Sequence, residues 1–347
     1  MMKSINNGCS ERRHVPWAGR KHCPRFACCQ HYHSQIPLLF TVEDLVASDS
    51  EELAQKCSLS YKALLAIRRV LLAQHTAFPV SGADLYEELL SSTAIVSTSI
   101  PSLDKLLDSG LYTGEITELS GGPGTGKSQV CFAAAVHTAH RLKQSVIYID
   151  TTGGLSASRL LQMLQVQTDH VEEQMEALQR IRVFRVFDIF SLLGCLHTIR
   201  CGGPQQASLG AGSVKAVIVD SVSAIISPTL GGKQNEGMSL MMQVAGALKT
   251  IAKDFNVAVL VTNHVTRGAG GELQAGLGLT WSHVPRTRLL LERSRGPGPL
   301  LGSTRTATLV KSSRQPCHIK AQFDLNWGSG SEEGLPGRKR ARDSSDS

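Results

Sequence analysis

Hydrophobic and polar residues follow two alternating patterns along most of this chain. Beyond residue 92, short apolar runs of strand length recur, and stretches with apolar residues at helical spacing separate them. Apolar strands that alternate with helices are typical of a mainly parallel sheet covered on both faces. The pattern therefore predicts an α/β core over residues 93–328. Its expected strands are 115–119, 145–150, 183–187, 214–220, 257–263, 287–292 and 307–310, and its expected helices are 127–142, 156–180, 188–200 and 237–255.

A smaller helical segment precedes this core. Residues 41–77 carry apolar residues, such as Leu64 and Leu71, at the spacing of two or three short amphipathic helices. A segment of this length buries too little surface for a strong core, so we expect an accessory N-terminal domain. Residues 78–92 contain Pro79 and Gly82 before a helical stretch, and we interpret them as a linker.

Both ends of the chain lack sustained periodicity, and we expect both to be disordered. Residues 1–40 hold six Lys and Arg against one Glu, so this arm carries 6 − 1 = +5 of the formal net charge of +7. The rest is close to neutral, and charge alone does not predict nucleic-acid binding. Residues 329–347 form a basic tail that contains a short cluster of Lys and Arg. This cluster is either a nuclear import signal or a segment that only increases solubility. The cluster consists of Arg338, Lys339, Arg340 and Arg342.

Composition narrows the class of protein. With 41% hydrophobic and 19% charged residues, the 347-residue chain can bury a sizeable core. Its nine cysteines show no regular spacing, which is typical of reduced thiols in the cytosol or nucleus. The group Cys23, Cys28, Cys29, His31 and His33 matches no standard zinc pairing. No apolar run reaches transmembrane length, so we expect neither secretion nor a membrane.

The sequence GGPGTGKS predicts a phosphate-binding loop, because it follows a strand and opens a helix. Its glycines let successive backbone N–H groups converge on phosphates, and the helix N-terminus favours the same negative charge. Lys127 would reach the β- and γ-phosphates, and the Ser128 hydroxyl would bind Mg²⁺. The expected ATP contacts are Gly121, Gly122, Pro123, Gly124, Thr125, Gly126, Lys127 and Ser128.

Polar residues end the neighbouring strands, at the edge where α/β sheets bind ligands. Asp220 follows an apolar run and would hold Mg²⁺ through water. Asn263 and His264 end another strand, and both could sense a γ-phosphate, although a histidine in such a place is more often structural or solvated.

One group needed for hydrolysis is missing from this edge. A nucleotide hydrolase needs a carboxylate that orients the attacking water, and the end of a neighbouring strand is a natural place for it. The stretch IYIDTTGG has Thr151 and Thr152 after Asp150 at this place. A threonine cannot act as the base, so this stretch leaves open whether the protein consumes ATP or mainly holds it.

The order of these motifs resembles the RecA-type recombinases of homologous recombination. GGPGTGKS, YID, VIVDS and LVTNH occur in the order found in that family, behind a small helical domain. The runs SLDKLLDSGLYTGE, YIDTTGGLSASRL and KSSRQP are similar to its eukaryotic paralogue branch, and the likeness extends from about Thr41 to Trp327. The resemblance implies a RecA-like core, ATP and Mg²⁺ as cofactors, and a role in DNA double-strand break repair.

The resemblance also implies roles for single residues. Thr152 stands where the recombinases keep a water-activating glutamate, and Arg159 matches an arginine that packs on the adenine. His264 replaces a glutamine that links the γ-phosphate to the DNA-binding loops. Lys311 and Arg314 lie where the family places residues that border a neighbour's ATP, and a structural salt bridge is the alternative role for these cations.

Two stretches match the DNA-binding loops of the family, residues 227–237 and 264–284. Lys233 and Arg267 are their clearest candidates for phosphate contacts, and simple solvated loops are the alternative. Family members polymerise through an F-x-x-A motif in the linker, and Val80 and Ala83 occupy those two positions. Because valine fills a phenylalanine pocket poorly, at a loss of about 1 kcal/mol or more, self-assembly should be weak.

From these features we expect a nuclear, ATP-binding recombinase paralogue with weak ATPase activity. It would bind single-stranded DNA as a subunit of a complex with other recombinase paralogues, and it would assist loading of the recombinase. One alternative is an autonomous DNA-stimulated ATPase that performs strand exchange. The other is a nucleotide-holding scaffold without DNA contact.

Overall fold

A computed structural model describes residues 50–57, 60–75, 81–206, 213–231, 234–268, 271, 273–293 and 304–325. The chain divides into two compact units, Met1–Val80 and Ser81–Ser347. Residues 1–40 and 329–347, which the sequence predicts to be disordered, lie outside the described residues, and so do all members of the cysteine and histidine group at 23–33.

The first unit contains two described helices, α2 (Ser50–Cys57) and α3 (Tyr61–His75). Leu53 of α2 and Leu64 of α3 are buried, as the amphipathic pattern predicts. The Arg68 guanidinium donates to the Ser50 hydroxyl at the start of α2, so the two helices are also joined by a polar contact. The remainder of the predicted helical segment lies outside the described residues.

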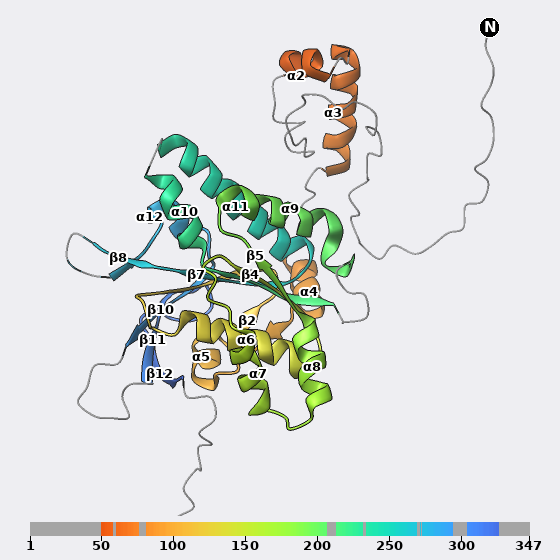
Figure 1. Cartoon of the computed structure of the whole chain (residues 1–347). Helices are drawn as coiled ribbons and strands as arrows, with labels where there is room; N and C mark the ends of the chain where they lie inside the picture. The colour runs from red at the N-terminus through yellow and green to blue at the C-terminus, as the bar shows by residue number, and fades with distance from the viewer. Residues whose placement is uncertain are drawn as a thin grey trace, which may run out of the picture. The chain divides into compact units, whose positions relative to one another are not determined.

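The second unit is built on one sheet with the strand order β12-β11-β10-β3-β7-β6-β4-β5 (Figure 1). The strands from β10 to β5 are parallel to their neighbours, and β11 and β12 add an antiparallel extension at one side. The predicted mainly parallel α/β core is confirmed. The strands are β3 (Ile116–Gly121), β4 (Ser145–Asp150), β5 (Ile181–Arg185), β6 (Val214–Asp220), β7 (Ala258–Asn263), β10 (Thr287–Arg293), β11 (Thr304–Lys311) and β12 (Lys320–Asp324).

Helices cover both faces of this sheet, and each face has its own hydrophobic core (Figure 1). Fully buried Tyr148 and Leu164 belong to one core, and Ile149 and Trp281 belong to the other. One face carries α5 (Pro101–Leu106), α6 (Lys127–His140), α7 (Ala157–Gln165) and α8 (Val171–Arg180), and the other carries α9 (Ile189–Gln206), α10 (Val222–Leu230) and α11 (Gln234–Asp254).

Short elements connect these layers. They are β1 (Ile95–Val96), β2 (Leu111–Tyr112), the hairpin of β8 (Val265–Arg267) and β9 (Leu273–Ala275), and α12 (Gly278–Ser282). In the described part of the predicted linker, the chain forms α4 (Gly82–Ser92), which the Ser81 hydroxyl caps by accepting from the Asp84 N–H. None of the residues of α4 is buried. Within the described chain, the helices are too short or too polar to cross a bilayer.

Several predicted boundaries were wrong for local reasons. The helix expected over 156–180 is interrupted between α7 and α8, where the Thr168 carbonyl accepts from the Gln174 side chain instead of a helical N–H. The strand expected at 183–187 lies at 181–185, because Asp188 caps the start of α9 by accepting from the Ser191 N–H. The connection expected at 201–213 begins as helix, since α9 continues to Gln206.

Candidate nucleotide site

The predicted phosphate loop joins β3 to α6, and its shape requires glycine at several positions. Gly124 and Gly126 have φ of 69° and 98°, which side-chain-bearing residues rarely adopt. A Cβ on Gly121 would lie 2.6 Å from the Leu291 carbonyl oxygen, so the loop also packs tightly on β10. Helix α6 begins at Lys127 without a side-chain cap. Its first backbone N–H groups therefore remain open to an anion, which fits a nucleotide phosphate.

The Lys127 ammonium lies inside this loop. It donates hydrogen bonds to the carbonyl oxygens of Gly121, at 2.8 Å, and Gly122, at 2.9 Å. Burial lowers the pKa of Lys127, and the nearby Asp220 carboxylate opposes that shift. A phosphate oxygen could replace these carbonyls as the acceptor, so the arrangement fits the predicted role of Lys127.

Asp220 is held at the end of β6 by two hydroxyl groups. The Tyr148 hydroxyl donates to its Oδ2 at 2.9 Å, and the Thr262 hydroxyl donates to its Oδ1 at 2.5 Å. Both donors stabilise the ionised carboxylate and fix its direction. Because each oxygen has a second lone pair, the side chain can still accept from the water of a bound Mg²⁺. Asp220 and Ser128 thus fit the predicted metal site, with Asp220 buried beside the phosphate loop.

Asp150 organises the turn that carries Thr152. Its carboxylate accepts from the backbone N–H groups of residues 152–155, over distances of 2.9–3.2 Å. These hydrogen bonds therefore use the Asp150 carboxylate to stabilise the turn. Thr152 is exposed on this turn. Its predicted place at the position of a water-activating group stays a prediction.

The two polar residues at the end of β7 have different surroundings. His264 is exposed, and its backbone N–H donates to the Ser223 hydroxyl at 3.1 Å. Partial burial and the Lys127 charge lower the pKa of its imidazole, and the Asp220 charge opposes the shift. Its contact with the γ-phosphate stays a prediction. The prediction that Asn263 also senses the phosphate was wrong, because its amide points into the protein and donates to Glu118 and to the Gly276 carbonyl.

A buried network around Glu118 was missed from the sequence. This fully buried carboxylate accepts from the side chains of Asn263, at 2.7 Å, and Trp281, at 3.0 Å, and forms an ion pair with Arg288. The available signal was the charged residue in the middle of the apolar strand at 116–121. The network joins β3, β7, β10 and α12, and through Gly276 it reaches the base of the β8–β9 hairpin.

Arg159, the predicted adenine contact, lies in the first turn of α7. Its Nε donates to Gln129 of α6 at 3.0 Å, and a terminal nitrogen donates to Gln162. Gln129 follows Ser128 directly, so Arg159 is held beside the first turn of the phosphate-binding helix. Its contact with adenine stays a prediction.

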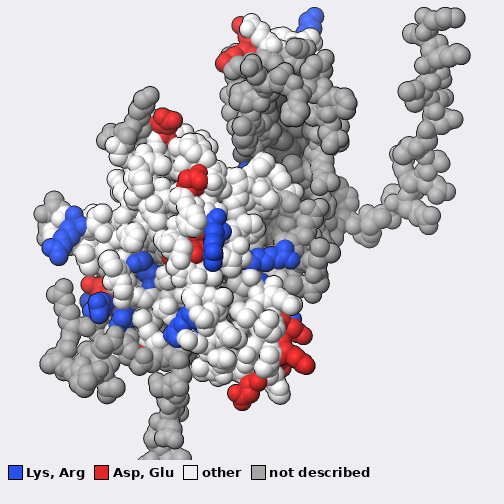
Figure 2. Space-filling view, viewed as in Figure 1, with Lys and Arg blue, Asp and Glu red and all other residues white. Residues whose placement is uncertain are grey.

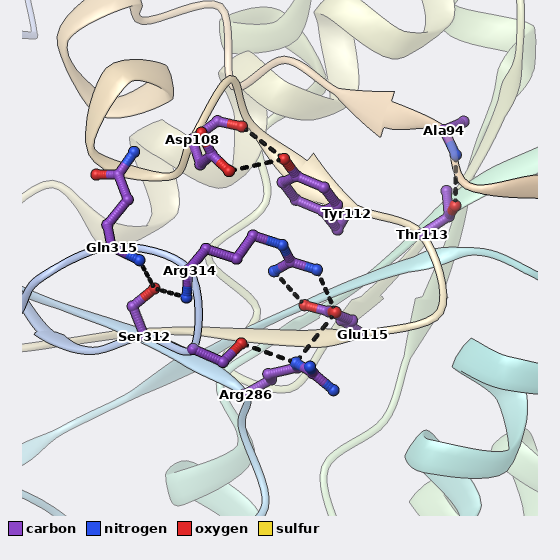
Figure 3. Close-up of polar contacts among 10 residues, drawn as sticks. Ala94, Asp108, Tyr112, Thr113, Glu115, Arg286, Ser312, Arg314 and Gln315 are labelled. Atoms are coloured by element: carbon purple, nitrogen blue, oxygen red, sulfur yellow. Dashed lines mark hydrogen bonds and ion pairs between the residues drawn. The ribbon is translucent and has the colours of Figure 1, made fainter. Parts of the chain in front are cut away.

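Lys311 and Arg314 lie at the opposite end of the sheet from the phosphate loop. Arg314 forms a bidentate ion pair with Glu115, and its guanidinium carbon lies 3.6 Å from the centre of the Tyr112 ring (Figure 3). Gly121 lies six positions after Glu115 along β3, so the two residues are about 20 Å apart. The Lys311 ammonium donates to the Ser282 carbonyl at 2.7 Å, and burial and Arg288 lower its pKa. Arg314 therefore cannot reach the nucleotide site of its own chain, and the alternative structural salt bridge is observed for it.

The two predicted DNA-binding stretches contain more regular structure than expected. Residues 227–237 hold the end of α10 and the start of α11, and Lys233 lies outside the described residues. Arg267 is exposed on the β8–β9 hairpin, opposite Leu273. On the face that Figure 2 shows, Lys and Arg side chains are spread among uncharged residues instead of forming one continuous basic surface. Their contact with DNA stays a prediction.

The predicted interface positions are only partly described. Val80 lies outside the described residues, and Ala83 is exposed near the start of α4. The same helix exposes Leu85, Tyr86, Leu89 and Leu90. An apolar helix face without a covering partner in the described chain is a candidate contact surface.

Comparisons with known proteins agree with the motifs. The model of the family described as Rad51 matches residues 90–322, and the model described as "RAD51D, N-terminal domain" matches residues 39–74. "DNA repair protein RAD51 homolog 4" of Mus musculus is 56% identical over 86% of this chain and 92% of its own length. The Bos taurus protein of the same name is 59% identical over 82% and 87%. "DNA repair and recombination protein RadA" of Aeropyrum pernix is 28% identical over 83% and 89%.

Proposed function

Because this chain belongs to the Rad51 family and to the recombinase paralogues of DNA repair, we propose that it binds ATP and acts as one subunit of a paralogue complex. The observation that supports the proposal most is the phosphate loop, in which the Lys127 ammonium and the uncapped N-terminus of α6 fit a triphosphate. Proteins of this family are ATP-binding and typically depend on Mg²⁺.

The nucleotide would act mainly as a ligand. Lys127, the open N-terminus of α6, Ser128 and Asp220 supply the binding groups, and Thr152 supplies no base. ATP with Mg²⁺ would then bias the conformation of the elements around the site and of the subunit contacts. Its hydrolysis would be slow, so the chain would be a weak ATPase of the RecA type.

Two exposed apolar surfaces support assembly with other proteins. One is the face of α4, and the other lies along β5, where Val183 and Phe184 are partly exposed and Phe187 follows. Strand β5 is the last strand of the sheet, so its outer backbone groups are available for another chain. Phe190, at the start of α9, extends this surface and is 68% exposed. Large exposed apolar surfaces are unusual on a protein that acts as a monomer, and they commonly mark contacts with other proteins. These two surfaces therefore favour a role as a subunit.

Assembly would also give Lys311 and Arg314 a function. In a head-to-tail arrangement, the end of the sheet that carries these cations would face a neighbour's nucleotide. Arg314 would need to exchange its Glu115 contact for a phosphate, whereas Lys311 would need only to leave a carbonyl oxygen. We therefore propose Lys311 as the more available of the two cations.

A role with single-stranded DNA follows from the same proposal. Arg267 on the β8–β9 hairpin and Lys233 are the proposed phosphate contacts. One or two cations per chain bind DNA weakly, so useful affinity would require the assembled complex. Within it, the protein would help to load or stabilise the recombinase, in the nucleus where recombinational repair takes place.

The proposal is tested by recovering the tagged full chain from nuclear extract and identifying co-purifying proteins by mass spectrometry. Wild type should recover other Rad51-family proteins, and Lys127→Ala should lose most of them. Lys143→Ala, a matched loss of an exposed lysine, should behave as wild type. Equal recovery by wild type and Lys127→Ala would contradict a nucleotide-dependent assembly.

A further inference from the structure

Residues at the ends of β10 and β12 pack against the phosphate loop. A Cβ built on Gly126 would lie 2.9 Å from the Leu325 side chain, just after β12. A Cβ built on Gly124 would lie 3.8 Å from a terminal nitrogen of Arg293, at the end of β10. We call strands β10 to β12 the wall, because residues at their ends pack against the glycines of the loop.

Arg305 makes the polar contact between this wall and the loop. Its Nε donates to the Gly124 carbonyl oxygen at 3.2 Å, and a terminal nitrogen donates to the Thr304 carbonyl at 3.0 Å. The side chain lies in β11 between paired strands and is only 8% exposed. Burial and the charge of Arg293 lower the pKa of Arg305, while Asp324 opposes the shift. Burial of a charged guanidinium costs free energy, and its hydrogen bonds to the Gly124 and Thr304 carbonyl oxygens offset part of that cost.

The contact controls the direction of a backbone donor. The Gly124 carbonyl and the Thr125 N–H belong to one planar trans peptide unit, so they point in opposite directions. When Arg305 holds the carbonyl oxygen toward the wall, the Thr125 N–H points away from the wall. Gly124 has little intrinsic preference that would fix this peptide, since glycine adopts positive and negative φ with similar ease.

We propose that Arg305 is a positioning residue of the nucleotide site, which fixes the Gly124–Thr125 peptide so that its N–H faces the phosphates. The proposal rests on the proposed ATP binding. It assigns to Arg305 an effect through loop geometry and not through direct contact with the nucleotide.

Arg293 provides a control that separates the loss of a positive charge beside the loop from the loss of the hydrogen bond to Gly124. It lies opposite Arg305 in the β10–β11 pairing, it is close to the same glycine, and it is exposed. Replacing either arginine by glutamine removes one positive charge beside the loop. Only Arg305→Gln also removes the bond to the Gly124 carbonyl. The difference between the two variants therefore measures the positioning effect.

The test is titration of the purified full chain with MgATP by calorimetry, for wild type, Arg305→Gln, Arg305→Lys and Arg293→Gln. We expect Arg305→Gln to weaken binding about tenfold, as the loss of one charge-assisted hydrogen bond predicts. Arg293→Gln should change it less than about threefold, since an exposed charge is screened. Arg305→Lys, which keeps the charge and one donor group, should lie between wild type and Arg305→Gln.

Hydrogen exchange of the nucleotide-free proteins supplies a second measurement. The amides of residues 124–126 should exchange faster in Arg305→Gln than in wild type, and Arg293→Gln should not differ. If Arg305→Gln does not fold, Arg305→Lys carries both measurements. Binding of MgATP by the Arg305 variants within twofold of wild type would overturn the inference. Failure of wild type itself to bind MgATP would instead refute the proposed function.

Discussion

The backbone N–H of Thr152 donates a hydrogen bond to the Asp150 carboxylate at 3.1 Å. Thr152, which we propose to occupy the position of a water-activating group, is thus fixed on a turn beside a carboxylate that already accepts from backbone N–H groups. Its exposed hydroxyl is neutral, so it accepts a proton from water far less readily than a carboxylate does.

Thr152→Glu should therefore increase ATP hydrolysis. A general base contributes about 10²–10⁴-fold to such reactions, and we expect at least a tenfold rise in turnover with ATP affinity little changed. Ser158→Glu, which adds the same charge at an exposed neighbouring position, should leave turnover at the wild-type level. The assay is steady-state phosphate release with binding measured in parallel. If Thr152→Glu binds ATP normally and its turnover does not rise, the interpretation of this position is wrong.

The Tyr148 hydroxyl supports the proposed metal site through Asp220. Tyr148→Phe removes one of the two hydroxyl donors to this buried carboxylate, and a hydrogen bond to a charged group contributes about 1.5–3 kcal/mol. We expect the free energy of unfolding in urea to fall by about that amount, and ATP affinity to become less dependent on Mg²⁺. Tyr86→Phe, on an exposed helix, is the matched control and should change neither quantity. Equal stability of the two variants would contradict the role of this hydroxyl.

His264 should make ATP binding depend on pH. In the free chain, partial burial and Lys127 lower the pKa of His264 below its ordinary value of about 6.5. A bound triphosphate would favour the protonated imidazole and raise that pKa, so binding would take up a proton between the two values. ATP affinity should consequently increase as pH falls through about 6.5.

His264→Gln should flatten this pH dependence of ATP affinity between about pH 7.5 and 5.5. Burial also lowers the pKa of His137, but this residue lies near the far end of α6, about 15 Å from Lys127 along the helix. His137→Gln should therefore keep the wild-type profile. Identical profiles for wild type and His264→Gln would show that His264 does not meet the phosphates.

Breaking the Glu118 network should destabilise the fold. Glu118→Gln would leave Arg288 without its buried counter-charge, which costs about 3–5 kcal/mol in comparable buried pairs. Glu292→Gln, in the same sheet and only partly buried, should cost less than about 1 kcal/mol. Both values are measurable by urea unfolding. A loss below 1 kcal/mol for Glu118→Gln would mean that the network contributes little.

The apolar surface along β5 is tested by charge insertion. Phe187→Asp should strongly reduce recovery of Rad51-family partners from extract, because it places an uncompensated charge in a contact that excludes water. The folded monomer should keep its stability, since Phe187 is 63% exposed. Val171→Asp, at a 67% exposed position on α8, is the control that should leave recovery unchanged. Unchanged recovery with Phe187→Asp would exclude this surface from the partner contact.

Sequence periodicity predicted the centre of the fold well, because its signals are local. The apolar runs ending at Asp150, Asp220 and Asn263 are strands, and the loop before Ser128 opens a helix. Strand β12 and helix α10 were missed. The sequence of α10 includes Pro228 near its end and looked like part of a loop, and β12 alternates exposed residues with few apolar ones.

Long-range contacts could not be predicted from spacing. Arg305 and Gly124 are distant in sequence, and their contact depends on the order of β3, β10 and β11 in the sheet. The same holds for Glu118 with Trp281 and for Arg314 with Tyr112. The motifs therefore predicted which residues belong to the nucleotide site, and the topology was needed to find which contacts hold these residues in place.

We propose above all that this protein retains ATP more than it consumes it. The most direct test measures ATP binding and ATP turnover in the same preparation of the full chain alone, with and without single-stranded DNA. We expect saturable Mg²⁺-dependent binding that Lys127→Ala abolishes, with turnover below about one per minute, compared with about 10 s⁻¹ for a typical enzyme. Turnover of many molecules per minute by the isolated chain would contradict it.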